Sequence, residues 1–199
     1  FAIAGLLILL WLPWNYIGAM FFFVLTFNLY RLNLGIANGS DLVLSMLACY
    51  SIGMATRPKW GSRFGGEFQQ IVFTLAVVFC QIQIAGIYFV SGWDKLTSDV
   101  WRSGEVFVRI MHYDPLFNPR FASFLDIPNV RLILSWLTIL FELTFAGLVW
   151  FKRLKYYVLI LGILFHFTII VMLSLPEFGI LMILSYLIFL NDEDYDRIR

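Results

Sequence analysis

An apolar run over residues 69–92 leads into the motif Tyr88-Phe-Val-Ser-Gly-Trp-Asp-Lys95. A helix needs about 20 apolar residues to cross the hydrocarbon core of a bilayer, and this run is long enough. Its apolar residues are continuous rather than alternating, which is typical of a transmembrane helix and not of a barrel strand. The stretch therefore predicts a membrane helix with a lysine at its end.

The composition of the whole chain indicates a polytopic membrane protein. Of the 199 residues, 61% are hydrophobic and only 14% are charged, whereas about one quarter of the residues of a soluble domain are charged. A net charge of +1 without any Lys/Arg-rich run argues against nucleic-acid binding. Cys49 and Cys80 lie in apolar runs and are interpreted as packing residues. No spacing of His and Cys residues predicts a metal site.

Seven apolar segments are candidate helices, at residues 2–12, 14–30, 41–55, 69–92, 130–151, 156–174 and 178–190. Pro13 favours a turn between the first two, although one bent helix over residues 2–30 is an alternative. The third and the last segments are short and would span a bilayer only if it were locally thin or if they were flanked by snorkelling groups. We predict an all-α, polytopic transmembrane helical bundle of about seven helices in a single domain. Because the chain starts with Phe1 inside an apolar run, we expect one further helix before it.

Basic residues in short loops predict the orientation of the bundle, because such loops stay on the cytoplasmic side. They fall in three places that alternating spans put on one side: Arg57, Lys59 and Arg63; Lys152, Arg153 and Lys155; and Arg197 with Arg199. The C-terminus is therefore predicted to be cytoplasmic and the connection 93–129 extracytoplasmic.

The connection 93–129 contains too many aromatic residues for a disordered linker. We predict an interfacial helix around residues 98–111, followed by a loop marked by Pro115, Pro119 and Pro128. This connection is either a lid over a cavity or an aromatic belt at the membrane surface.

Three ionisable residues lie where hydrocarbon is expected, and such residues usually face a partner inside the bundle. They are Lys95, Glu142 and His166. An ionised Glu142 needs a donor such as His166, whereas a protonated Glu142 can donate one hydrogen bond itself. Glu142 and His166 are either an interhelical clasp or part of a site that handles protons.

Gln81, Tyr88 and Lys95 follow one another at steps of seven, which places them on one helix face if the helix persists through Ser91-Gly92. A polar stripe of this kind either lines a cavity or packs against another polar helix. Lys95 itself is either an anchor at the membrane surface or a base. A base must be uncharged, and the adjacent carboxylate of Asp94 favours the charged form.

The motifs together resemble a known family. They comprise Asn28-Leu-Tyr-Arg-Leu-Asn33, Asn38-Gly-Ser-Asp41, the Tyr88-to-Lys95 motif with Trp101 and Gly104, Phe141-Glu-Leu143, Phe165-His166 and the closing helix from Phe178. This pattern resembles the horizontally transferred transmembrane (HTTM) domain. That domain is the membrane part of vitamin K-dependent gamma-carboxylase and of bacterial relatives that include proteins of sporulation-delaying toxin maturation.

The resemblance implies a site that handles a quinone or another lipid. In the carboxylase a lysine of this motif helps to deprotonate vitamin K hydroquinone, and a histidine of a later helix belongs to the active site. Lys95 and His166 are the residues that match, and Gln81, Tyr88 and Glu142 are the expected cavity-lining residues. The sequence departs from the carboxylase at Asp94, where that motif has a second lysine, and these 199 residues include no large luminal region.

Two functions fit these observations. In the first, the chain is an integral protein of a bacterial inner membrane whose cavity binds a quinone or other lipid and assists the modification of an exported peptide or protein. This function predicts a cavity of several hundred cubic ångströms with Lys95, Tyr88 and His166 in its walls. In the second, the chain is a non-enzymatic subunit that scaffolds a larger membrane protein complex.

Overall fold

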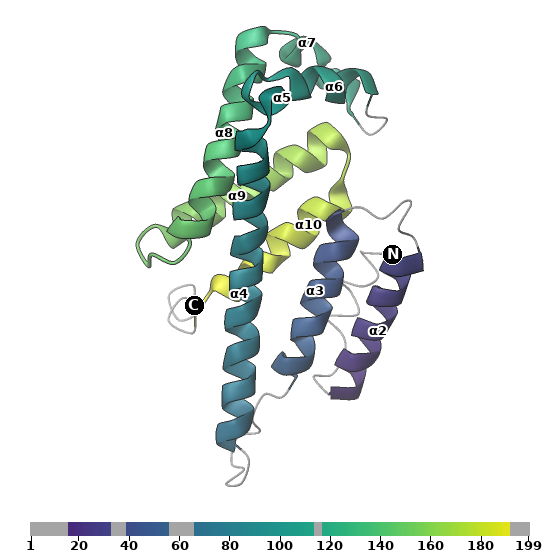
Figure 1. Ribbon diagram of the computed structural model, residues 1–199, viewed down its shortest axis with the longest axis vertical. Coiled ribbons are helices and arrows are strands. Elements are labelled where there is room, and N and C mark those ends of the chain that lie inside the picture. Colours follow the sequence, from purple (N-terminus) through teal and green to yellow (C-terminus); the bar gives the residue numbers. More distant parts are fainter. Residues whose placement is uncertain (1–15, 33–38, 56–65, 114–116, 192–199) are drawn as a thin grey trace. The chain divides into compact units, whose positions relative to one another are not determined.

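The computed structural model describes residues 16–32, 39–55, 66–113 and 117–191, and every regular element within these ranges is a helix. The elements in chain order are α2 (Tyr16–Leu32), α3 (Gly39–Met54), α4 (Gly66–Thr97), α5 (Asp99–Arg102), α6 (Glu105–Tyr113), the 3₁₀ helix η1 (Pro119–Phe121), α7 (Ala122–Leu125), α8 (Pro128–Leu148), α9 (Lys155–Leu173), α10 (Pro176–Ser185) and the 3₁₀ helix η2 (Tyr186–Phe189) (Figure 1). The predicted all-α class is confirmed for this part of the chain. The chain divides into two compact units, Phe1–Ile82 with Leu190–Arg199, and Gln83–Phe189.

Three of the described helices are long and apolar enough to cross a membrane, namely α4, α8 and α9. They correspond to the predicted segments 69–92, 130–151 and 156–174. Shorter apolar helices cover Gly18–Asn28, Asp41–Met54 and Pro176–Phe189. The predicted segment 2–12 and the proposed turn at Pro13 lie outside the described residues.

In the first unit, small residues allow helices to approach closely. Helices α2 and α3 pack against each other. Gly53 of α3 faces Ala76 of α4, and a Cβ atom added to Gly53 would lie only 2.6 Å from the Cβ of Ala76. Small residues are common where membrane helices touch, because they let the backbones come together.

In the second unit, α4 continues without a break through Ser91-Gly92 to Thr97. The polar stripe required a helix that persists through Ser91-Gly92, and α4 does so. Tyr88 and Lys95 therefore lie two turns apart on the same face of this helix. Lys95 belongs to the last turn of α4, where a positive charge also complements the partial negative charge of the helix end.

The single interfacial helix predicted around residues 98–111 was wrong, because this segment forms two helices, α5 and α6. Gly104 separates them with a φ angle of +76°, a left-handed conformation that side chains with a Cβ rarely adopt. A Cβ at Gly104 would also lie 2.9 Å from the backbone nitrogen of Leu132 and 3.0 Å from the carbonyl carbon of Arg131. The glycine thus turns the chain and lets it lie directly on the start of α8.

Helix α6 is amphipathic. Its apolar face, which includes Phe107, packs on a cluster of buried side chains formed by Phe117, Leu125 and Met172. Its exposed face carries an ion pair between Arg109 Nη2 and Glu105 Oε1 at 3.1 Å. Figure 1 shows α5, α6 and α7 grouped beside the start of α8. The described residues of the connection are therefore a folded part of the second unit rather than a linker.

Asn118 links this connection to the end of α9 by two hydrogen bonds. Its backbone N–H donates to the carbonyl oxygen of Met172 at 2.8 Å, and its side-chain amide donates to the carbonyl oxygen of Val171 at 3.1 Å. The last carbonyl groups of a helix have no partner within the helix, so donors from outside stabilise the helix end. The Asn118 side-chain oxygen also accepts from the backbone N–H of Arg120 at the start of η1.

A tight reversal joins α9 to α10. Ser174 ends α9 in the left-handed conformation with φ of 50°, and Pro176 occupies the first turn of α10, a position where the missing N–H of proline costs no helical hydrogen bond. The predicted segment 178–190 therefore begins two residues earlier as a helix and ends as the 3₁₀ turn η2. Helix α10 packs back along α9.

We predict that Gly104→Ala destabilises the protein. The left-handed conformation costs a residue with a Cβ about 1–2 kcal/mol, and the close backbone of Leu132 adds steric strain. Gly86→Ala is the matched control, because a Cβ there would have no atom within 4 Å beyond the adjacent backbone of its own helix and alanine is favoured over glycine in a helix by about 1 kcal/mol. Thermal unfolding in detergent should show a lower midpoint for Gly104→Ala and an equal or higher one for Gly86→Ala. Equal midpoints for the two variants would contradict this assignment.

Candidate functional site

Lys95 is surrounded by polar and aromatic groups at the end of α4. Its Nζ donates to Glu142 Oε2 at 2.8 Å and to Glu142 Oε1 at 3.0 Å, and a third contact reaches Ser91 Oγ at 2.5 Å. The ammonium group also lies 4.9 Å from the centroid of the Trp101 ring, within the range of a cation–π interaction. All the hydrogen bonds of the ammonium group are therefore made within the protein.

The ion pair is largely withdrawn from solvent, with 17% of the Lys95 side chain and 7% of the Glu142 side chain exposed. Gly92 makes this possible. A Cβ at Gly92 would lie 3.0 Å from both the Glu142 Cβ and the Leu143 backbone nitrogen, so glycine lets α4 and α8 touch at the level of the pair. The sequence interpretation offered His166 as a donor for Glu142, but the structure pairs Glu142 with Lys95 instead.

A second polar cluster is built by Tyr88, His166 and Tyr186. The hydroxyl of Tyr88 lies 2.5 Å from His166 Nε2 and 2.5 Å from the hydroxyl of Tyr186. These residues come from α4, α9 and η2, and only 3%, 1% and 4% of their surfaces are exposed. His166 pairs with Tyr88 rather than Glu142 because Tyr88 lies two turns, or about 10 Å, before Lys95 along α4.

Aromatic rings enclose this cluster. The ring of Tyr88 packs on Phe145 with a centroid distance of 4.0 Å and meets the edge of Phe141 at 5.8 Å. The imidazole of His166 lies between Phe165 at 5.2 Å and Phe178 at 5.6 Å. Edge-to-face arrangements of this kind stabilise aromatic pairs, so the polar groups are held in an otherwise apolar surrounding.

Gly162 makes room for Tyr186. A Cβ at Gly162 would collide with the hydroxyl oxygen and ring carbons of Tyr186. The tyrosine ring therefore lies directly on the backbone of α9, one helical turn before His166. Neither Gly162 nor Tyr186 stood out in the sequence, because both lie in apolar segments without a recognisable motif.

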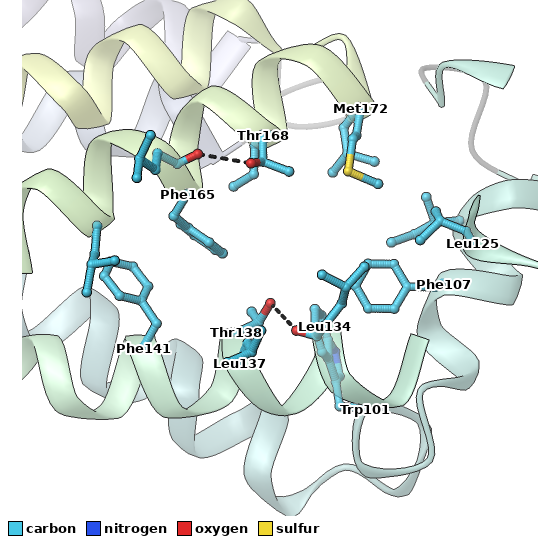
Figure 2. A pocket seen from close by; sticks show the side chains of 15 residues that line it. Trp101, Phe107, Leu125, Leu134, Leu137, Thr138, Phe141, Phe165, Thr168 and Met172 are labelled. Atoms are coloured by element: carbon cyan, nitrogen blue, oxygen red, sulfur yellow. Dashed lines mark hydrogen bonds between the residues drawn. The ribbon is translucent and has the colours of Figure 1, made fainter. Parts of the chain in front are cut away.

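An apolar cavity of about 430 Å³ lies between α8 and α9 and is bordered by residues of α5, α6 and α7. It is lined by Trp101, Phe107, Ile110, Leu125, Leu134, Leu137, Thr138, Phe141, Leu161, Leu164, Phe165, Thr168, Ile169, Met172 and Leu173. Figure 2 shows Thr138 and Thr168 on opposite walls. Their hydroxyls donate to carbonyl oxygens of their own helices, those of Leu134 and Leu164. The walls therefore suit an apolar ligand better than a polar one.

The cavity lies beside the two polar clusters, but they do not share one continuous space. Lys95, Tyr88, Glu142 and His166 are not among the residues that line this cavity, contrary to the expectation that its walls would include them. Aromatic residues shared by both stand between them: Trp101 covers Lys95, and Phe141 and Phe165 contact the cluster of Tyr88 and His166.

Gln81, the remaining predicted site residue, is half-buried in α4 and belongs to the first unit. Within the described ranges, no three His, Cys, Asp or Glu side chains are grouped so that they could hold a metal ion.

Comparison with known proteins identifies the family. The HTTM domain matches residues 42–193, which is more than half of the chain. The chain belongs to the HTTM domain family. The resemblance noted from the sequence is thereby confirmed, and the matched residues of this HTTM domain include the ion pair, the second polar cluster and the whole cavity.

A curated relative extends this finding. The sporulation-delaying protein SdpB of Bacillus subtilis (strain 168) is 28% identical to the HTTM chain over 129 residues. The aligned region is 62% of this chain but only 40% of SdpB, so the chain matches less than half of the length of that relative. No solved structure matches the chain.

We predict that Lys95→Met and Glu142→Gln each destabilise the HTTM domain more than the double variant does. Removing one member of a buried ion pair leaves the other charge without a partner and typically costs about 3–5 kcal/mol, whereas removing both avoids this penalty. The double-mutant cycle is measured by unfolding in detergent.

The exposed pair of Glu105 and Arg109 is the control for this cycle. Helical surface pairs of this type contribute only about 0.3–0.5 kcal/mol, so Glu105→Gln and Arg109→Met should have small effects. If the effects of the two buried substitutions simply added in the double variant, Lys95 and Glu142 would not be coupled in the folded protein.

Proposed function

We propose that this HTTM domain binds a quinone or another lipid in the cavity between α8 and α9 and assists the maturation of an exported peptide or protein. The observation that carries the proposal is the position of Trp101, whose ring lines the apolar cavity and also lies 4.9 Å from the Lys95 ammonium group. The apolar part of a ligand would occupy the cavity, and its reactive end would pass Trp101 to reach Lys95.

The cavity has features of a site that is loaded from the bilayer. Its volume of about 430 Å³ lies in the range of small-molecule sites, about 300–1,000 Å³. Leu137 and Leu164 line it, and each is 57% exposed. The cavity is therefore open between α8 and α9 in the region of the membrane-crossing helices, where an apolar molecule could enter without passing through water.

Lys95 and Glu142 supply the proposed proton chemistry. Lys95 can act as a base only after its Nζ has given up a proton, and Glu142 Oε2 at 2.8 Å is an acceptor within hydrogen-bonding distance. Transfer of one proton from Nζ to Oε2 leaves a neutral amine and a neutral carboxylic acid. The amine could then accept a proton from a hydroxyl group of the ligand. His166 is the second candidate catalytic residue in this proposal.

A second candidate function is that of a scaffold subunit in a larger membrane complex. It is favoured by the complete internal pairing of Lys95, because an ammonium group that is bound to Glu142 and Ser91 can serve as an interhelical clasp without any reaction. A scaffold subunit needs no ligand in the cavity, whereas the catalytic function requires one.

Filling the cavity should remove the bound lipid. Thr138→Trp places a large ring in the cavity wall, whereas Leu140→Trp on the same helix changes a side chain that is 53% exposed and outside the lining. Mass spectrometry of the purified proteins should find a co-purified quinone or lipid with the wild type and with Leu140→Trp, and at least a tenfold lower amount with Thr138→Trp. Equal amounts in all three proteins, or none in the wild type, would favour the scaffold.

The chemical part of the proposal is tested in cells with Lys95→Met. Peptides secreted by a strain that produces this variant are compared by mass spectrometry with those of a wild-type strain. A mature peptide that is lost although the variant is inserted and keeps its lipid would support a catalytic Lys95. An unchanged secreted peptide would leave Lys95 as a structural residue.

We further propose that the HTTM domain lies in a bacterial inner membrane with its C-terminus in the cytoplasm and the connection 93–129 outside. Helix α8 crosses between the two regions, so the exposed Ser103 and Arg153 lie at opposite ends of its span. In a protein whose Cys49 and Cys80 are replaced by serine, a membrane-impermeant maleimide should label Ser103→Cys in intact cells and Arg153→Cys only after lysis. The reverse labelling would invert the orientation.

A further inference from the structure

The second polar cluster contains one buried nitrogen that has no hydrogen-bond partner among the described residues. His166 is 1% exposed, and its Nε2 is paired with the Tyr88 hydroxyl. Its Nδ1 is buried and has no hydrogen-bond partner in the part of the chain that the structure describes. His112 behaves differently, because its Nδ1 lies 2.8 Å from the carbonyl oxygen of Val108 in its own helix.

The hydrogens available in the cluster determine the tautomer of His166. Each hydroxyl has one hydrogen to donate, and a neutral imidazole has one N–H. If Tyr186 donates to Tyr88 and Tyr88 donates to Nε2, both short contacts contain a hydrogen and the ring carries its own hydrogen on Nδ1. The Nδ1–H is then the only polar hydrogen of this cluster without a partner in the described part of the chain.

Every other arrangement leaves more groups unpaired. If Nε2–H donated to Tyr88, the hydrogen of either Tyr88 or Tyr186 would have no acceptor, and the lone pair of Nδ1 would also be unused. A doubly protonated ring would leave both the Nδ1–H and a tyrosine hydrogen unpaired. Because an unsatisfied buried polar group costs about 1–3 kcal/mol, the arrangement with Nδ1–H is favoured.

The packing around the cluster keeps this arrangement in place. Tyr186 lies on Gly162, where no side chain intervenes, and the Tyr88 ring is packed on Phe145 at 4.0 Å. The two hydroxyls therefore cannot exchange partners without moving α9 or η2. Tyr186 acts through Tyr88 on the imidazole and is a positioning residue.

We propose that the Nδ1–H of His166 is a buried donor site for an acceptor oxygen, either of a water molecule or of a carbonyl compound, and that Tyr186 and Tyr88 set the ring tautomer for it. An N–H group selects ligands with a lone pair and rejects pure donors. This donor site is separate from the lining of the apolar cavity, although Phe165 borders both. The donor site does not depend on whether the apolar cavity binds a lipid.

The tautomer is measured by nitrogen NMR on the full chain in lipid nanodiscs. The chain has two histidines, so labelling of histidine nitrogen gives two imidazoles, and His112→Gln leaves the signals of His166 alone. We expect Nδ1 to be protonated and Nε2 to be bare. Protonation of Nε2, with or without that of Nδ1, would overturn the assignment.

Two variants of the same size test the role of the hydroxyls. Tyr88→Phe removes the hydrogen bond to Nε2 and should shift the Nε2 resonance strongly, with loss of the single tautomer. Tyr186→Phe leaves that bond in place and should give a smaller shift of the same resonance. If Tyr88→Phe left both nitrogen resonances unchanged, the proposed chain of donors would be wrong.

The acceptor is identified with two probes of matched size. Acetophenone has a carbonyl oxygen, and ethylbenzene has none. A shift of the Nδ1–H signal with acetophenone alone supports a carbonyl site, and magnetisation exchange of this hydrogen with water, without a response to either probe, supports a water site. Equal responses to both probes, or neither a response nor exchange with water, would contradict a donor site for an oxygen.

Discussion

The ion pair between Lys95 and Glu142 is the constraint on which the rest of the second unit depends. A charged side chain among membrane-crossing helices needs a partner, because its transfer from water is costly. The pair satisfies this need only if α4 and α8 touch, and Gly92 allows that contact at the level of Glu142. The ring of Trp101 lies over the ammonium group of the pair.

Separation of polar and apolar groups organises the rest of the site. Two polar clusters lie on one side of a group of aromatic rings, and a cavity with almost no polar surface lies on the other. The rings that separate them come from the connection 93–129, from α8 and from α9. An arrangement of this kind can hold an apolar molecule next to groups that transfer protons, and the same contacts can also serve to clasp helices together.

Membership of the HTTM domain family gives these features a context. The match to residues 42–193 includes every residue of the site, whereas α2 lies before it. The similarity to SdpB concerns 40% of that protein.

The sequence by itself determined the helical class and included, among its seven predicted segments, the three helices long enough to cross a membrane, because these follow from the length of apolar runs. It also singled out Lys95, because a charge at the end of such a run is costly unless it has a partner. It could not determine which residue pairs with Glu142. His166 was the donor that the sequence suggested, but the contact at Gly92 brings Glu142 to Lys95, and His166 lies beside Tyr88, two turns before Lys95 along α4. Tyr186, Gly162 and the cavity became visible only in the tertiary structure, because their roles arise from contacts between residues that are far apart in the chain.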